Sequence, residues 1–187
     1  TCGYDISIPE ILPQIGKGGD LLVPSLIGKE NDKKHGDKIR KIHNHQYKKM
    51  IEKVHLFKGV RELFNELKER KIKIAIASSA NKNEIEYYLR ELKEKIDVVV
   101  SGEEVKHTKP EPDIFALAIQ RLGINKEFCA VVGDSVWDII ASNRLGIPCI
   151  ILLSGGNDPE KLKAEHPAKI LQNIEELRKN IDNVLAL

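Results

Sequence analysis

From Gly59 to its end, this 187-residue chain alternates short apolar runs with amphipathic segments, and no other feature of the sequence constrains the fold as strongly. The apolar runs have the length of strands and cover residues 71–77, 97–100, 128–132 and 148–153. The amphipathic segments have the spacing of helices and cover residues 60–70, 83–95, 113–122, 138–145 and 174–181. Strand-length apolar runs that alternate with helices are typical of parallel strands covered on both faces. We therefore predict an α/β fold with a doubly wound parallel sheet.

The first 58 residues have a different pattern, which is helical and rich in lysine. A long polar helix is expected over residues 32–54, with an incomplete apolar stripe that includes Met50 and Val54. We expect a small helical domain in residues 1–58 and an α/β core domain in residues 59–187, with the boundary near Gly59.

The charges of the chain are balanced and dispersed. Thirty basic and 28 acidic residues give a net charge of +2, and the lysines form no single block, so the pattern does not indicate nucleic-acid binding. The three cysteines have no metal-ligand spacing, the longest apolar run is too short to cross a bilayer, and no signal-peptide pattern opens the sequence. We expect a cytoplasmic protein without membrane or nucleic-acid partners, either a monomer or a homodimer.

The first predicted strand ends at Ser78 and Ser79, just before a helix. The C-terminal ends of parallel strands meet at one edge of the sheet, and ligands bind at that edge. A hydroxyl followed by the free N–H groups of a helix start suits a phosphate. Either serine could instead simply cap the helix, and both interpretations stay open at this point.

The second predicted strand is followed by a loop that reaches Lys109. Pro110 disfavours helical backbone at Lys109, and Pro112 starts the next helix, so this lysine lies on a stiffened segment. An ammonium held there could neutralise the charge of a phosphate or a carboxylate. The alternative is an ordinary solvated lysine.

The third strand end carries two acids. Val131 and Val132 are predicted to be buried, Gly133 permits a turn, and Asp134 emerges at the edge with Asp138 four residues further on. A carboxylate there suits Mg²⁺, which takes one or two protein carboxylates together with substrate oxygens and water. Asp138 could also stabilise the N-terminus of its helix. A hydroxyl, a lysine and an acid pair on successive strand ends together indicate phosphoryl transfer.

These residues resemble motifs of the haloacid dehalogenase-like superfamily, in the branch that contains phosphoglycolate phosphatase and β-phosphoglucomutase. Three family motifs appear in order over nearly the whole chain: the strand that ends in Ser78, the run Lys109-Pro-Glu-Pro-Asp-Ile-Phe115, and Gly133-Asp-Ser135 with Asp138. The resemblance implies that Ser78 hydrogen-bonds the transferring phosphoryl group and that Lys109 bridges this group to the nucleophile. It also implies that Asp134 binds magnesium and that Asp138 supports the metal shell or its loop.

The helical unit before Gly59 resembles the family's cap, which closes over the substrate and excludes water. In similar proteins a loop of the cap contacts the substrate, which makes Lys17, Gly18 and Gly19 candidates for substrate recognition. The alternative is a glycine turn in which Asp20 caps the next helix.

One family motif is missing from the sequence. The resemblance calls for a strand ending in Asp-x-Asp-Gly-Thr, which supplies the nucleophile and the general acid/base, and the chain contains no such motif. As printed, the chain is therefore expected to be inactive. That strand would lie between the strands that end at Ser78 and Asp134, and two unpaired strand edges inside a sheet are disfavoured. We therefore expect a preceding segment that is missing, cleaved or supplied by another chain, and a cap that is incomplete at its N-terminus.

The resulting expectation is a magnesium-dependent phosphatase of a small phosphorylated metabolite, such as phosphoglycolate or a sugar phosphate. A phosphomutase would use the same motifs and would return the phosphoryl group to the sugar instead of water. A hypothesis of another class is a non-catalytic remnant that binds a phosphorylated ligand, which the absent nucleophile motif favours.

Overall fold

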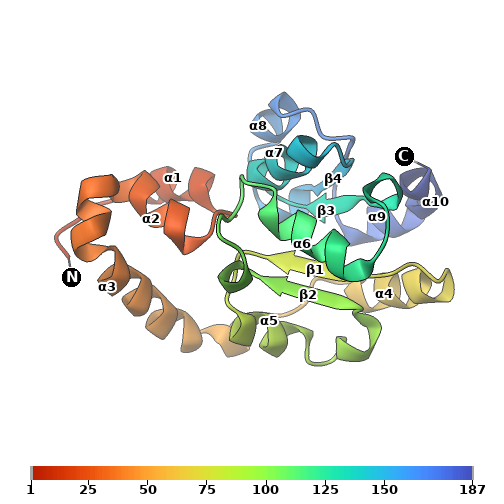
Figure 1. Cartoon of the computed structure of the whole chain (residues 1–187), viewed down its shortest axis with the longest axis horizontal. Helices are drawn as coiled ribbons and strands as arrows, with labels where there is room; N and C mark the ends of the chain where they lie inside the picture. The colour runs from red at the N-terminus through yellow and green to blue at the C-terminus, as the bar shows by residue number, and fades with distance from the viewer. Residues whose placement is uncertain (1, 187) are drawn as a thin grey trace.

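The computed structural model describes residues 2–186, and it has an elongated shape with a helical unit at one end and an α/β core at the other (Figure 1). The predicted α/β fold is confirmed. The helical unit consists of α1 (Ile8–Ile11), η1 (Leu12–Gln14), α2 (Gly19–Ile27), α3 (Lys29–Lys48) and η2 (Ile51–Lys53). The predicted division into domains at residues 58 and 59 falls in the turn before α4 and stays a prediction.

The core begins at α4 and alternates helices with strands. Its elements are α4 (Val60–Glu69), β1 (Ala75–Ser78), α5 (Lys82–Leu89), η3 (Lys93–Lys95), β2 (Val98–Ser101), η4 (Gly102–Glu104), α6 (Asp113–Leu122), η5 (Lys126–Phe128), β3 (Val131–Gly133), α7 (Val136–Leu145), β4 (Cys149–Leu152), η6 (Leu153–Gly155), α8 (Pro159–Ala164), β5 (Lys169–Leu171), α9 (Ile174–Lys179) and α10 (Ile181–Leu185). Sequence patterns did not predict α8 or β5, because six and three residues are too few for a clear period.

All strand pairs are parallel, and they form two hydrogen-bonded groups. β1 pairs with β2, whereas β4 lies between β3 and β5. Among the described residues, β1 and β3 do not pair with each other, so each strand has one unpaired edge. The two groups are held together by helices instead.

Helices cover both faces of the two strand groups. On one face, Ile114, Phe115 and Ala118 of α6 pack against side chains of β1, β2 and β3 in a single apolar cluster. On the other face, α4, α9 and α10 pack against residues of β1, β4 and β5. Each fully buried aliphatic or aromatic side chain stabilises the fold by about 1.5–3 kcal/mol, and these clusters bridge the two strand groups without backbone pairing.

Two expectations about apolar positions are wrong. Val132 is 47% exposed although it lies within β3. Its register partner is Ile150 of β4, and the two side chains lie on the same face of the sheet. Val132 is nevertheless exposed, because the other edge of its strand is unpaired. The helix expected over residues 32–54 begins at Lys29 and ends at Lys48, which leaves Met50 and Val54 exposed beyond its end.

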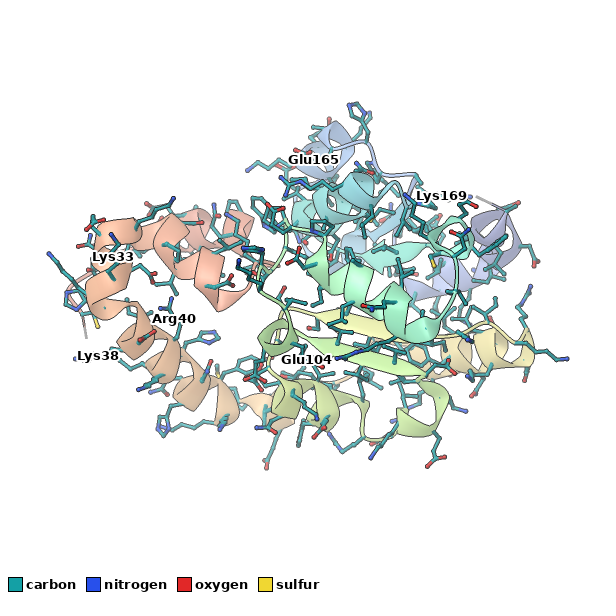
Figure 2. The ribbon with its side chains drawn as sticks, viewed as in Figure 1. Lys33, Lys38, Arg40, Glu104, Glu165 and Lys169 are labelled. Carbon is teal, nitrogen blue, oxygen red and sulfur yellow. The ribbon has the colours of Figure 1, made fainter. Side chains whose placement is uncertain are left out.

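The helical unit has little apolar core. Val23 and Ile27 of α2 are its buried apolar residues, and Gly36 is the buried residue of α3. Arg40, on the side of α3 that faces α2, reaches Asp32 at 2.8 Å and the carbonyl oxygen of Gly19 at 3.2 Å (Figure 2). Polar contacts therefore join α2 and α3. None of the helices in the described part of the chain is long and apolar enough to cross a membrane.

Candidate active site

The carboxyl ends of β1 and β3 deliver Ser78 and Asp134 to the edge of the core that meets the helical unit (Figure 1). The loop after β2 brings Lys109 to the same region, because its ammonium contacts Asp138 in the first turn of α7, the helix after β3. This edge is where parallel α/β folds bind their ligands.

Lys109 is a buried lysine with a defined partner. The residue is 7% exposed, and its ammonium nitrogen lies 2.8 Å from Oδ1 of Asp138, which is 5% exposed. The aromatic ring of Phe115 lies on another side of the ammonium, with its centroid at 5.6 Å. The alternative of an ordinary solvated lysine is therefore wrong. A buried ion pair of this kind holds its charges in place, since removing either member leaves the other uncompensated.

Asp138 supports the start of α7 with its second oxygen. Oδ2 accepts hydrogen bonds from the hydroxyl of Ser135 at 2.6 Å and from the Ser135 N–H at 3.1 Å. Burial alone would raise the pKa of Asp138, but the nearby Lys109 ammonium and the bonds from Ser135 outweigh it and lower the pKa. Both carboxylate oxygens already have protein donors, so this geometry fits a supporting role. A metal–ligand role for Asp138 stays a prediction.

Asp134 has the opposite environment. The residue is open to solvent at the edge, and among the described residues no donor side chain contacts its carboxylate. The protein atoms crowded around the carboxyl raise its pKa, and the Asp138 carboxylate adds to this effect while Lys109 opposes it. The following loop is close: a Cβ on Gly155 would lie 2.1 Å from Oδ2, and Asn157 donates its side-chain N–H to the Asp134 carbonyl oxygen at 2.9 Å.

A cation could bind at Asp134 only if substrate oxygens and water supplied further ligands. Within residues 2–186, no group of three or more His, Cys, Asp or Glu side chains is placed to hold a metal ion. Mg²⁺ needs one or two protein carboxylates and completes its shell with substrate oxygens and water. The free carboxylate of Asp134 therefore fits as one ligand of such an ion.

The two serines at the end of β1 do not cap α5. Asn81 does so, because its side-chain oxygen accepts the N–H of Glu84 at 3.0 Å. Ser78 Oγ accepts the N–H of Ala80 at 3.2 Å, and among the described residues its hydroxyl hydrogen has no acceptor. Ser79 instead donates its hydroxyl to the carbonyl oxygen of Gly16 at 3.3 Å, across the boundary between the core and the helical unit. Ser78 is thus the serine whose hydroxyl remains free to donate to a ligand.

The loop of residues 16–20 lies directly on this edge. It contacts the sequence neighbour of each of the three predicted site residues: Ser79 beside Ser78, Thr108 beside Lys109, and Ser135 beside Asp134. The hydroxyl of Thr108 donates to Asp20 Oδ1 at 2.7 Å, and a Cβ added to Gly16 would lie 2.6 Å from the Ser135 hydroxyl. The helix-cap alternative for Asp20 is wrong, because α2 has Gly18 at its N-cap and no side-chain cap bond.

The three predicted residues of this loop have different surroundings. Gly18 is buried against Thr108, where an added Cβ would lie 2.6 Å from the threonine methyl carbon. Lys17 directs its ammonium to Trp137 of α7. Gly19 faces away from the core, since its carbonyl oxygen accepts the Arg40 bond and a Cβ there would meet the Arg40 side chain. The structure therefore brings Lys17 and Gly18 to the edge, but not Gly19.

Sequence reasoning missed Thr108 and Asn157, and it left open whether Trp137 packs under the loop of Asp134 or faces the helical unit. Thr108 and Asn157 have common residue types and carry no periodic or motif signal. Trp137 offered one signal, since it is the single tryptophan of the chain and lies between two candidate acids. Its orientation toward the helical unit depends on tertiary contacts.

Comparison with known proteins identifies the family of this arrangement. The chain matches the family model of haloacid dehalogenase-like hydrolases over residues 2–152. It is 28% identical over 169 residues to a phosphoglycolate phosphatase of Yersinia pestis, an alignment that covers 87% of this chain and 73% of that protein. It is 33% identical over 129 residues to a phosphorylated carbohydrates phosphatase of Thermotoga maritima, covering 68% and 60%. A hydrolase from Pseudomonas syringae superposes with a TM-score of 0.88 at 26% identity, covering 96% and 84%.

Proposed function

The chain belongs to the haloacid dehalogenase-like hydrolase family, and we propose that it serves as a magnesium-dependent phosphatase of a small phosphorylated metabolite in the cytoplasm. One observation carries the proposal. The buried ion pair of Lys109 with Asp138 adjoins the free carboxylate of Asp134, and the loop 16–20 lies over this edge. Phosphoryl transfer depends mainly on such positioned charges.

Ser78 and Lys109 are proposed to bind the phosphoryl group. The free hydroxyl hydrogen of Ser78 would donate to one phosphoryl oxygen. The Lys109 ammonium would donate to another, while Asp138 holds it in position. Donors that are already oriented need no reorganisation when negative charge develops in the transition state. Ser78, whose hydroxyl hydrogen has no acceptor among the described residues, would therefore contribute more to turnover than to folding.

Asp134 is proposed as the magnesium ligand that this chain supplies. A bound Mg²⁺ would neutralise charge on the phosphoryl oxygens. Because its pKa is raised, the Asp134 carboxyl begins to take up a proton at a higher pH than an ordinary aspartate does. Cation binding should therefore weaken as the pH falls. The loop of Gly155 and Asn157 holds the backbone of this residue against the core.

The nucleophile is proposed to come from a strand outside this sequence. β1 and β3 each have an unpaired edge, and both pack under α6 in one cluster, so a parallel strand between them would pair with both. Its carboxyl end would emerge between Ser78 and Asp134. An aspartate there would stand next to the groups proposed to bind the phosphoryl group and the cation.

The substrate class follows from the loop 16–20 and from the relatives. Phosphoglycolate and phosphorylated carbohydrates are the substrates that the names of two relatives state. In this chain, Lys17 and Gly18 are the loop residues at the edge, so we propose that they contact the organic part of the substrate.

The proposal is tested by phosphate release from a panel of phosphate esters with Mg²⁺, using the chain joined to a segment that carries the Asp-x-Asp strand. Asp134→Ala should lower kcat/KM by at least about a hundredfold, because each 1.36 kcal/mol of lost transition-state stabilisation is tenfold in rate. Asp182→Ala, an exposed acid of α10 in the same core, is the matched control and should retain activity. Near-normal turnover by the Asp134 variant would refute the assignment.

The products and the ligand-binding behaviour separate the competing functions. Interconversion of sugar phosphates without phosphate release would indicate that the protein is a mutase and not a phosphatase. Binding of inorganic phosphate that depends on Lys109, with no turnover of any ester in the presence of the added strand, would indicate a binding protein instead.

A further inference from the structure

The segment between Lys109 and α6 makes few backbone hydrogen bonds of its own. Pro110 and Pro112 have no N–H to donate, and the N–H of Glu111 makes a single turn bond of 3.0 Å. Among the described residues, the carbonyl oxygen of Pro110 accepts a hydrogen bond only from the side chain of Arg144. A half-buried carbonyl group needs a partner, so the path of the backbone just after Lys109 depends on this arginine.

Arg144 reaches this segment from the last turn of α7. One of its guanidinium nitrogens, Nη1, lies 3.0 Å from the carbonyl oxygen of Pro110 and 2.6 Å from Oε1 of Glu111. The first turn of the same helix carries Asp138, which holds the Lys109 ammonium at 2.8 Å. Two side chains of one helix therefore hold Lys109 at both ends, Asp138 at the ammonium and Arg144 at the backbone that follows.

A lysine that is held at its ammonium alone has no fixed orientation. Its side chain is a flexible four-carbon stem, so the ammonium could turn about its contact with Asp138 whenever the backbone of the loop moved. Holding the backbone as well gives the three N–H bonds of the Lys109 ammonium a defined direction. Asp134 lies two residues before α7, so both points of attachment and this carboxylate belong to one rigid part of the core. Groups that are already oriented stabilise a transition state more than mobile groups do.

We propose that Arg144 is a positioning residue of the site, which holds the backbone after Lys109 and thereby keeps the ammonium at a fixed position relative to Asp134. The inference rests on the proposed phosphatase function and deepens it by naming a further residue. The hydrogen bond and the ion pair of Arg144 go to Pro110 and Glu111, so it acts on the reaction through Lys109. The alternative is a purely structural role, as a cation at the C-terminal end of α7.

A double-mutant cycle tests whether Arg144 acts through Lys109. In the chain joined to the Asp-x-Asp segment, with Mg²⁺ and p-nitrophenyl phosphate, Arg144→Ala should lower kcat about tenfold and change KM less than about twofold. In a Lys109→Met background the same substitution should lower kcat less than about twofold, because the oriented group is already absent. Equal losses of kcat in the two backgrounds would overturn the proposal. Arg70→Ala, at an arginine that is 40% exposed and pairs with Asp182, is the matched control and should retain kcat.

Two further variants separate the two contacts of Arg144. Arg144→Lys keeps a donor for the Pro110 carbonyl oxygen and should recover part of the kcat that Arg144→Ala loses. Glu111→Gln removes the ion pair but leaves the bond to Pro110, so it should lower kcat less than about threefold. A loss of kcat in Glu111→Gln as large as in Arg144→Ala would overturn the role of the Pro110 bond. These variants decide the question even if Lys109→Met turns over too slowly to measure.

Amide hydrogen exchange provides a readout that needs no turnover. In the 187-residue chain, Arg144→Ala should speed exchange of the hydrogen-bonded Glu111 N–H at least about fivefold, whereas Arg70→Ala should leave it unchanged. Unchanged exchange in Arg144→Ala would overturn the inference, and faster exchange throughout the core would overturn it as well, by showing a purely structural role. If no ester is hydrolysed, the proposed function fails, and the exchange rates still decide whether Arg144 holds the loop of Lys109.

Discussion

The core and the helical unit are built from different interactions. Among the described residues before Gly59, Val23 and Ile27 are the buried apolar side chains, whereas both faces of the core strands are covered by continuous apolar clusters. Six large apolar residues of the helical unit and its linker are exposed instead: Ile8, Leu12, Ile15, Met50, Val54 and Phe57. Burial of apolar area is the main driving force of folding, so the core supplies most of the stability.

This difference affects how each region holds charge. In the core, the ion pair of Lys109 with Asp138 is almost completely buried, and its members are fixed by packing. In the helical unit, the pair of Arg40 with Asp32 keeps about a quarter of each side chain exposed, at 29% and 21%. The helical unit meets the core through polar contacts such as Asp20 with Thr108 and Tyr47 with Tyr88. We therefore expect it to move against the core at little cost.

Breaking the buried ion pair should have the largest effect. Asp138→Ala leaves the Lys109 ammonium buried without a partner and removes two bonds at the start of α7, so it should lower the free energy of unfolding by about 3–5 kcal/mol. The matched variant Asp32→Ala, in the helical unit, should cost about 1 kcal/mol or less. Urea unfolding of both proteins measures the difference. Equal losses would show that the two ion pairs are equivalent.

Substitution of one buried valine in each region compares how much apolar burial stabilises the core and the helical unit. Val100→Ala creates a cavity at a fully buried position of β2 and should cost about 2–3 kcal/mol. Val23→Ala, at a buried position of α2, should cost less than about 1 kcal/mol in global unfolding, because the surrounding helical unit contains few apolar neighbours to lose. Thermal and urea unfolding measure the global loss, and hydrogen exchange should locate the effect of Val23→Ala in residues of α2 and α3. A larger loss for Val23→Ala would make the helical unit part of the cooperative core.

The smallest expected effect depends on pH. Asp97 accepts the N–H of Ile74 at 2.7 Å and the Lys68 ammonium at 3.0 Å, and these bonds lower its pKa. A lowered pKa in the folded state means that the carboxylate stabilises the fold above its unfolded pKa of about 3.9 and loses this contribution as the pH falls through the folded value. Asp97→Asn should therefore cost about 1 kcal/mol near pH 7, and the cost should shrink below about pH 4.

The control for this titration is Asp182→Asn, an acid whose side chain is 81% exposed. Its effect on the free energy of unfolding should stay within about 0.5 kcal/mol across the same pH range. Unfolding curves measured from pH 3 to pH 7 provide the comparison. A constant difference between wild type and Asp97→Asn would show that the carboxylate charge is not what stabilises this position.

Much of the core could be predicted because its elements have strong local signals. The helix over 113–122 was predicted with the bounds that α6 has, and four predicted strands occur, of which β1, β3 and β4 are shorter than their apolar runs and β2 is shifted by one residue. These apolar runs are longer than the strands because apolar residues continue into the turns. Phe128, for example, lies in η5 and is 82% exposed. The positions of the predicted strand ends were sufficient to predict that Ser78, Lys109 and Asp134 lie in one region, since the carboxyl ends of parallel strands meet at one edge of the sheet.

The sequence by itself determined the alternating pattern, the fold class and the order of the residues along the edge of the core. The tertiary structure decided what each of them contacts. Asp138 and Asp134 are four residues apart and both acidic, yet one has two occupied oxygens beside Lys109 and the other has none. Local periodicity records which face of an element is buried, but the partner of a charge depends on loops from distant parts of the chain. That is why the Lys17 and Trp137 pair, 120 residues apart, appears only in the folded protein.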